Sequence, residues 1–150
     1  YTGGLMLAPE FFREHLFPWM RKIGVLCKNK KIPFIYHSDG VLWEVVEDLV
    51  EMGVTSLHPI EPQSMDVGEV KSRVAGRLAV LGSVEVDTLC RGSREEVEAL
   101  VRDRLRRAAP GGGYCLGSSN SIPDYVNVEN YITLLELGDR LGTYPIEIAE

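Results

Sequence analysis

The segment "FIYHSDG", residues 34–40, is an apolar run that ends abruptly on histidine, serine, aspartate and glycine. Short β-rich runs bounded by turn residues are typical of strands. Polar side chains that directly follow such a strand lie at its carboxyl end, where Gly40 lets the backbone turn sharply. We therefore predict a buried strand that presents His37 and Asp39 at one edge of a sheet.

Three further segments repeat this pattern, each of them after a stretch with helical periodicity. They are "TSLHPIEP" (55–62), "RLAVLGSVEV" (77–86) and "GGGYCLGSSNSIP" (111–123). The polar residues at their ends are His58 and Glu61, Ser83 and Glu85, and Ser118, Ser119 and Asn120. Every predicted strand thus ends in side chains that can bind or react.

Helical patterns lie between the strands and at both ends of this region. We predict helices from Pro9 to about 27, over 41–53, 66–76 and 93–108, and from about 128 to 141. Ser93 and Glu96 form the sequence pattern of a capping box at the start of the fourth helix. The expected inward faces include Trp19 and Ile23 on the first helix and Leu134 and Leu135 on the last.

The alternation of helices with strands predicts parallel β/α units with right-handed crossovers. Polar clusters after every strand favour a (β/α)8 barrel, in which such ends converge on one site. An open doubly wound sheet is disfavoured because no GxGxxG follows the first strand. A full barrel needs eight strands and about 250 residues, so these 150 residues with four strands predict half of a TIM barrel.

Composition narrows the class of partner. The net charge is −6, with 22 acidic and 16 basic residues and no basic stripe, which argues against nucleic-acid binding. The apolar stretches are shorter than the roughly 20 residues that cross a bilayer, so we predict a cytoplasmic protein with no membrane partner. The three cysteines, Cys27, Cys90 and Cys115, are widely spaced and are predicted to be reduced, mostly buried thiols.

Five segments resemble a known family, in order and with matching spacing. They are "GGLMLAPEFFREHLFPWMRKI" (3–23), "FIYHSDG" (34–40), "LHPIEPQSMDVGEVK" (57–71), "LAVLGSVEVDTLCRGSREEV" (78–97) and "GGGYCLGSSNSIPDYVNVENY" (111–131). Together they resemble the C-terminal half of the uroporphyrinogen decarboxylase superfamily, which holds the haem-pathway decarboxylase and cobalamin-dependent methyltransferases. The resemblance implies a (β/α)8 barrel whose second half is a single domain formed by residues 1–150. The N-terminal half is then absent or supplied by another chain.

Within that superfamily, the methyltransferase branch binds zinc with a His-x-Cys pair and a second cysteine. In this chain His37 matches the histidine, whereas Asp39 and Asn120 stand where the two cysteines would be. A set of His37, Asp39 and Glu61 is harder than a thiolate set and suits catalytic zinc or another divalent metal. The same three residues are the expected catalytic groups, and Asp39 could instead act as a base or bind substrate.

The decarboxylase branch matches less well, because its arginines and aspartate come from N-terminal strands. Its last-strand histidine is replaced here by "SSNSI", residues 118–122. The resemblance therefore implies a methyltransferase-like enzyme that handles methyl groups with a corrinoid or thiol partner. We expect a small-molecule substrate, bound by His58, Ser118, Ser119 and Asn120, and a corrinoid protein as a candidate partner. A carboxy-lyase and a non-catalytic half-barrel are the alternatives.

A free half-barrel would expose strand edges and apolar surface. We therefore expect either the missing N-terminal half or a homo-oligomer to cover them.

Overall fold

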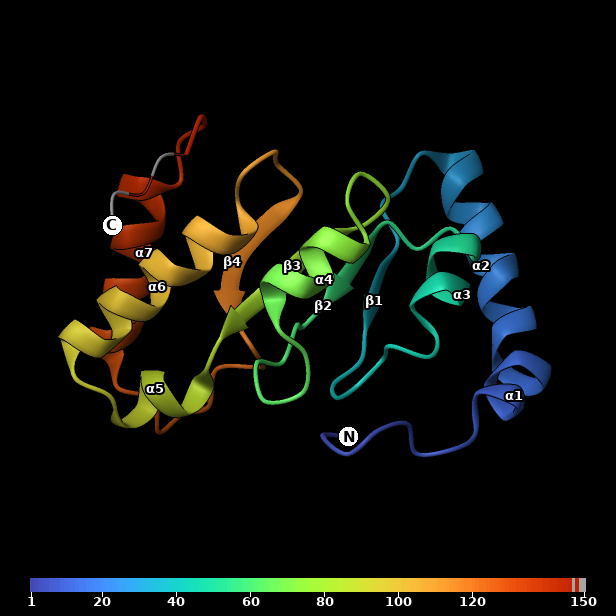
Figure 1. Cartoon of the computed structure of the whole chain (residues 1–150), viewed down its shortest axis with the longest axis horizontal. Helices are drawn as coiled ribbons and strands as arrows, with labels where there is room; N and C mark the ends of the chain where they lie inside the picture. The colour runs from blue at the N-terminus through green and yellow to red at the C-terminus, as the bar shows by residue number, and fades with distance from the viewer. Residues whose placement is uncertain (147, 149–150) are drawn as a thin grey trace.

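The computed structural model describes residues 1–146 and 148. Its centre is one sheet of four parallel strands in the order β1-β2-β3-β4 (Figure 1). The strands are β1 (Ile35–His37), β2 (Ser56–His58), β3 (Ala79–Val84) and β4 (Tyr114–Ser118). Strands that are consecutive in sequence are therefore neighbours in space, as in a barrel, and the order never reverses as it does in a doubly wound sheet.

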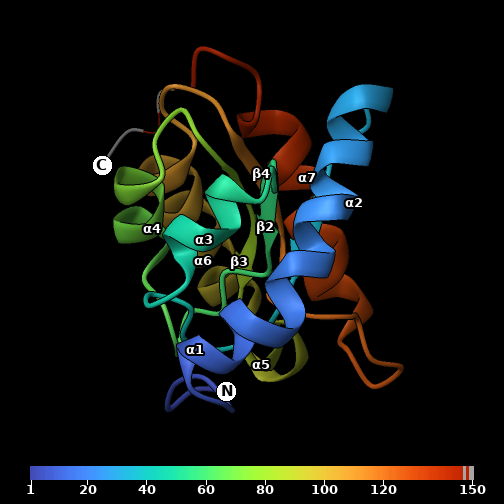
Figure 2. The same ribbon diagram turned by 90° about the vertical axis from the view of Figure 1, so that its right-hand side faces the viewer.

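Helices precede, connect and follow the strands. They are α1 (Pro9–Phe11), the π-helical η1 (Phe12–Leu16), α2 (Phe17–Lys30), α3 (Val46–Glu51), α4 (Val67–Arg73), α5 (Val86–Arg91), α6 (Arg94–Ala108) and α7 (Val128–Leu141). The first three form one continuous helical run. Helices α3, α4 and α6 lie along one face of the sheet, whereas α2 and α7 stand at its two ends (Figures 1 and 2).

Most helix boundaries follow the sequence signals, although the helix predicted over 41–53 extends only from Val46 to Glu51. Ser93 and Glu96 form the predicted capping box, with each side chain bonded to the other residue's backbone N–H. The last helix has the predicted bounds and is capped by the Asn127 side chain. Helix α5 was not predicted, and its N-cap residue, Glu85, makes no side-chain capping bond that the sequence could have signalled.

The core consists of two clusters of buried apolar side chains. Members of the first, which joins the early strands to α2, α3 and α4, include Phe17, Leu49, Leu57, Val70 and Val80. The second joins β3 and β4 to α5, α6 and α7, and includes Val84, Leu89, Val97, Val101 and Leu134. Both clusters lie on the helix side of the sheet, so the opposite face, which includes the exposed Ile35, has no layer over it among the described residues.

The predicted inward faces of two helices are partly wrong. Trp19 is 63% exposed, and on α7 Leu135 is 54% exposed, although Leu134 is buried as predicted. Helix α2 instead packs on its Phe17–Gly24 side, so closely that a Cβ at Gly24 would lie 1.7 Å from the Met52 carbonyl oxygen. Both end helices thus carry a second apolar stripe that the described residues do not cover, as expected for half of a barrel.

In the part of the chain described, we find no helix that combines the length and the apolar character needed to cross a membrane.

Candidate active site

Two histidines meet at the carboxyl end of the sheet. The parallel register pairs His37 of β1 with His58 of β2, so both side chains project to the same face. Their Nδ1 atoms are 2.9 Å apart and their ring centroids 4.8 Å. A hydrogen bond at this distance needs one N–H donor and one unprotonated acceptor. The pair therefore holds at most one positive charge in this geometry, and when neutral it can accept one proton.

His58 is the more enclosed member of the pair. Burial lowers its pKa below the ordinary histidine value, and the neighbouring His37 lowers it further, while the carboxylate of Asp39 acts in the opposite direction. The neutral imidazole of His58 is thereby favoured near neutral pH.

The lowered pKa of His58 predicts that the fold is less stable in mild acid. Below about pH 6.5 the unfolded chain takes up a proton at this position more readily than the folded chain, so stability falls as pH falls. In chelator-treated protein, the loss of unfolding free energy between about pH 7.5 and 5.5 should be larger for the parent than for His58→Gln. Urea unfolding at the two pH values measures this, and equal losses in both proteins would contradict it.

Asp39 and Asn120 join the two ends of the sheet. The Asn120 side-chain amide donates to the Asp39 carboxylate at 3.4 Å, a long and weak hydrogen bond. These residues follow β1 and β4, which are separated by two strands in the sheet. The sheet must therefore curve enough to bring its first and last loops together at one mouth, as a barrel does.

Glu61 serves the loops rather than the histidine pair. Its Oε2 accepts hydrogen bonds from the Gly40 N–H at 3.1 Å and from the Ser64 hydroxyl at 2.8 Å. The loops after β1 and β2 are tied together in this way. Although Glu61 lies at the mouth, as its position at a strand end predicts, it is directed at the backbone of Gly40.

The donor set at the mouth does not present the expected three metal ligands. Within residues 1–146 and 148 we find no group of three His, Cys, Asp or Glu side chains placed to hold a metal ion. His37 and His58 offer two nitrogens, of the kind that zinc binds at about 2.0–2.1 Å. Glu61 is directed at the Gly40 N–H, and Asp39 accepts, among the described residues, only a weak hydrogen bond from Asn120. The role of His37, Asp39 and Glu61 as a metal site stays a prediction.

The two serines of the last strand end shape its loop. The Ser118 hydroxyl donates to the Asn120 carbonyl at 2.6 Å. Ser119 is buried, and its N–H donates to the Val84 carbonyl at 2.7 Å. Both lie at the mouth near Asn120, and their role in substrate binding, like those of His58 and Asn120, stays a prediction.

The cysteines are less buried than predicted. Cys115 is exposed, and Cys27 and Cys90 are half-buried. Alternate residues of a strand point to opposite faces, and Tyr114 takes the helix side of β4, where it packs against the core. Cys115 therefore faces the uncovered inner face of the sheet, which its local sequence could not reveal.

Sequence reasoning missed an ion pair beneath the mouth. The Arg104 side chain is 11% exposed and donates to Glu85 Oε1 and to the Ser83 carbonyl, each at 2.8 Å. The second carboxylate oxygen of Glu85 is buried and has no partner among the described residues. Glu85 was noted only as part of a polar strand end, and Arg104 lies in the charged run "RDRLRR" (102–107), which looks solvent-exposed.

The backbone near the end of β3, just before Glu85, has an unusual conformation that hydrogen bonds hold in place. Gly82 and Ser83 have φ values of +91° and +78°, and a Cβ at Gly82 would lie 2.8 Å from the Ser118 carbonyl oxygen. The Tyr114 hydroxyl donates to the Gly82 carbonyl at 2.9 Å and lies 3.0 Å from the Ser83 hydroxyl. Burial raises the pKa of Tyr114 to about 12, so this hydroxyl keeps its proton.

A cavity of about 510 Å³ is lined by His58 and Ser118 and by apolar side chains of β3, β4 and α7, with no Asp, Glu, Lys or Arg among its described residues. Two further cavities open at the mouth. The first, of about 400 Å³, is polar and is lined among others by Glu61, Glu85, Asp87 and Asn120. The second, of about 630 Å³, is mostly apolar and reaches Asp39. Among the described residues that line either cavity there is no lysine or arginine. These two cavities therefore present carboxylates, of which Glu85 is already paired with Arg104.

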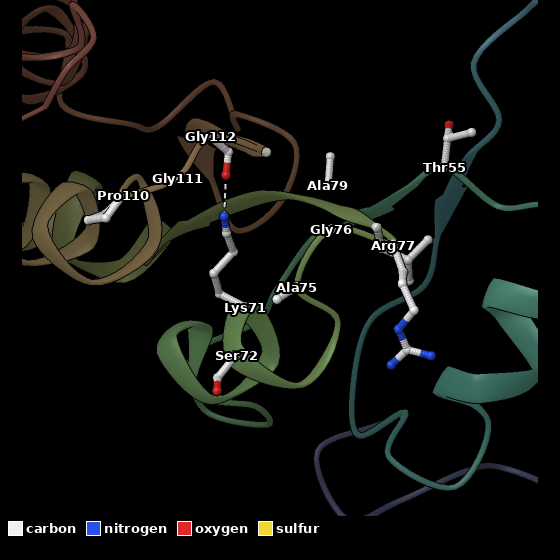
Figure 3. Close-up of a pocket in the computed structure, with 12 residues that line it drawn as sticks. Thr55, Lys71, Ser72, Ala75, Gly76, Arg77, Ala79, Pro110, Gly111 and Gly112 are labelled. Carbon is white, nitrogen blue, oxygen red and sulfur yellow. Dashed lines mark hydrogen bonds between the residues drawn. The ribbon is translucent and has the colours of Figure 1, made fainter.

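Another cavity, of about 540 Å³, lies at the opposite edge, near the amino ends of β2, β3 and β4 (Figure 3). The Lys71 ammonium there donates to the Gly112 carbonyl (Figure 3). Arg77 is paired with Glu47 at 2.5 Å. Both cations are thus engaged within the protein, and barrel enzymes place their chemistry at the carboxyl ends of the strands, so we assign the candidate site to the mouth.

Comparison with known proteins agrees with the fold and the resemblance. The sequence profile of a family described as Uroporphyrinogen decarboxylase (URO-D) matches residues 2–141. A uroporphyrinogen decarboxylase from Pseudomonas fluorescens (strain SBW25) is 27% identical over 134 residues, which are 86% of this chain and 36% of that protein.

Among solved structures, a methyltransferase from Methanosarcina mazei superimposes with a TM-score of 0.73 at 19% identity, over 91% of this chain and 39% of that one. This likeness concerns the fold, and together with the four sequential parallel strands it confirms the predicted half of a (β/α)8 barrel. The chain spans well under half the length of both relatives.

Proposed function

The chain belongs to the uroporphyrinogen decarboxylase family, and we propose that it forms half of the active site of an enzyme that transfers methyl groups. The observation that carries this proposal is a hydrogen-bonded pair of imidazoles at the carboxyl edge of the sheet. His37 and His58 are joined at 2.9 Å. The cavity that His58 lines contains no carboxylate among its described residues, and two other cavities near the strand ends contain carboxylates and no described lysine or arginine.

The charge of the mouth favours methyl transfer over decarboxylation of a polycarboxylate. A carboxylated substrate would meet Asp39 in one cavity, or Glu61 and Asp87 in the other, and like charges repel. Glu85 is already paired with Arg104. A carboxy-lyase would need all its arginines from another part of the barrel. A neutral or cationic substrate needs no such compensation.

The imidazole pair supplies a proton acceptor. A thiol or hydroxyl acceptor must lose its proton when its sulfur or oxygen gains a methyl group, and imidazole is suited to take that proton near neutral pH. The neutral pair has a free position for one proton, and Asp39 lies close enough to affect the charge on His58. A corrinoid, when bound, would supply the methyl group. The proposal does not depend on a bound zinc or other divalent ion, which would be an addition to it.

The uncovered apolar stripes of α2 and α7 bear on how the site is completed. Trp19 and Ile23 at one end of the sheet, and Ile132 and Leu135 at the other, are exposed. We propose that the other half of a barrel packs against both stripes, either from the rest of the polypeptide or from a second copy. A corrinoid protein would then approach the mouth.

A non-catalytic half-barrel is the remaining alternative. Loss of function would leave the core intact while the strand ends lost their polar residues. The histidine pair, the Asp39–Asn120 link and the Arg104–Glu85 pair are all retained at or below the mouth, which favours a working site.

The reaction class can be tested on the complete protein. It is mixed with methylcobalamin and the neutral thiol 2-mercaptoethanol, and the loss of methylcobalamin absorbance is followed. Carbon dioxide release from uroporphyrinogen is measured on the same preparation, with its metal content. We expect methyl transfer without decarboxylation. Decarboxylation alone would support the carboxy-lyase, and the lack of both reactions would support the non-catalytic alternative.

A further inference from the structure

The larger cavity at the mouth is built differently from the polar one. It lies between the segment that precedes α1, the helical run α1–η1–α2 and the loop after β1, and has a volume of about 630 Å³. Apolar side chains make up most of its lining, including Leu5, Met6, Phe12, Phe17 and Tyr36. Asp39 is the one charged side chain among the described residues that line it.

We propose that this cavity binds a small molecule with a ring-sized apolar body and one hydroxyl or amino group, which donates to Asp39. Known ligand pockets have volumes of about 300–1,000 Å³, apolar walls and a few polar groups that orient the ligand. The cavity has all three features, and it lies at the carboxyl end of β1, where Ser38 and Asp39 line it.

The wall of the cavity suits a flat apolar group. The rings of Phe12 and Phe17 are stacked with centroids 6.0 Å apart, and Phe17 is fully buried, so this wall is fixed by the core. Tyr36 adds a third, half-buried ring. Aromatic side chains pack well against other rings in offset or edge-on arrangements.

The rim of the cavity is apolar but uncovered. Met6 is 83% exposed and Leu7 is 48% exposed, in a segment without regular secondary structure. Contiguous exposed apolar side chains beside a cavity mark binding surfaces, and methionine adapts its shape to different ligands. A ligand that fills the cavity would remove these side chains from water.

Asp39 sets the charge that the ligand can carry. Among the described residues, only Asn120 donates to its side chain, at 3.4 Å, and the carboxylate is exposed to the cavity mouth. A hydroxyl or amine can therefore donate to it, whereas a carboxylate on the ligand would be repelled.

This inference deepens the proposed function, since it names the class of substrate that would bind at this end of β1, although neither His37 nor His58 lines the cavity. It rests on that function only for the reaction, because binding is measured without a methyl donor. The two can therefore fail separately: binding without methyl transfer would contradict the proposed function, and methyl transfer without this binding would contradict the inference.

The test compares three para-substituted toluenes on the complete protein by titration calorimetry. They are 4-methylphenol, which has a donor, 4-methylanisole, which lacks one, and 4-methylbenzoate, which carries a negative charge. Hydrogen bonds to charged groups predict that 4-methylphenol binds about tenfold or more tightly than 4-methylanisole, and that 4-methylbenzoate binds more weakly than both.

Two variants locate the binding. Asp39→Asn should weaken the binding of 4-methylphenol and strengthen the binding of 4-methylbenzoate, because the substitution removes the charge of the side chain and keeps its shape. Asp87→Asn, which removes a carboxylate from the neighbouring polar cavity, should change neither. The inference would be overturned if the parent bound all three molecules with equal affinity. It would also be overturned if Asp39→Asn selected among them as the parent does, or if both substitutions had equal effects.

Discussion

Replacing Arg104 by methionine is expected to destabilise the fold by about 3–5 kcal/mol, because it leaves a largely buried carboxylate without its partner. Glu85 is 23% exposed at its side chain and receives a hydrogen bond from Arg104 at 2.8 Å. The same guanidinium also binds the Ser83 carbonyl, so its loss leaves a backbone acceptor unsatisfied as well. Urea unfolding monitored by circular dichroism measures the change.

The double variant Arg104→Met/Glu85→Leu is the matched control. Replacing a whole buried ion pair by apolar side chains is often nearly neutral, so the double variant should recover most of the stability that Arg104→Met loses. An Arg104→Met variant within about 1 kcal/mol of the parent would show that the pair is solvated and does not fix the end of β3.

The elements that could be predicted are those whose signals are local. The capping box at Ser93 and Glu96 and the turn at Gly40 depend on a few neighbouring residues, and the polar strand ends recur four times along the chain. Together they were sufficient for the parallel half-barrel and for a site at the carboxyl edge, although α5, which has no capping side chain, was missed.

The contacts of the site depend on pairing between distant residues and were not predictable. His37 and His58 touch because the strands pair in one register, and a shift of one residue would point the side chains to opposite faces. Asp39 and Asn120 are 81 residues apart and meet only because the sheet curves. Arg104 is buried because α6 crosses below the end of β3, which nothing in its charged neighbourhood indicates.

The errors in predicting which faces of α2 and α7 are buried have a common cause. Each helix has apolar residues on more than one side, and periodicity cannot tell which side packs within the chain. Gly24 decides the matter for α2, because only a residue without a side chain permits the close approach to Met52. Trp19 and Leu135 consequently lie on the uncovered sides.

The second large effect is expected at His37. Replacing it by alanine removes one imidazole of the pair and, with it, the hydrogen bond that places the proton acceptor. Loss of a positioned general base costs about 10²–10⁴-fold in rate. Because His37 is exposed, we expect little change in unfolding. His15→Ala, which removes an exposed histidine on the η1 segment, is the matched control.

The most direct test of a working site at the strand ends is therefore the rate of methyl transfer from methylcobalamin to 2-mercaptoethanol by the parent, His37→Ala and His15→Ala proteins. The account predicts a loss of about 100-fold or more in His37→Ala alone, with its unfolding midpoint unchanged. A measurable parent rate that His37→Ala retains within about twofold would contradict it, because the histidine pair would then take no part in the chemistry.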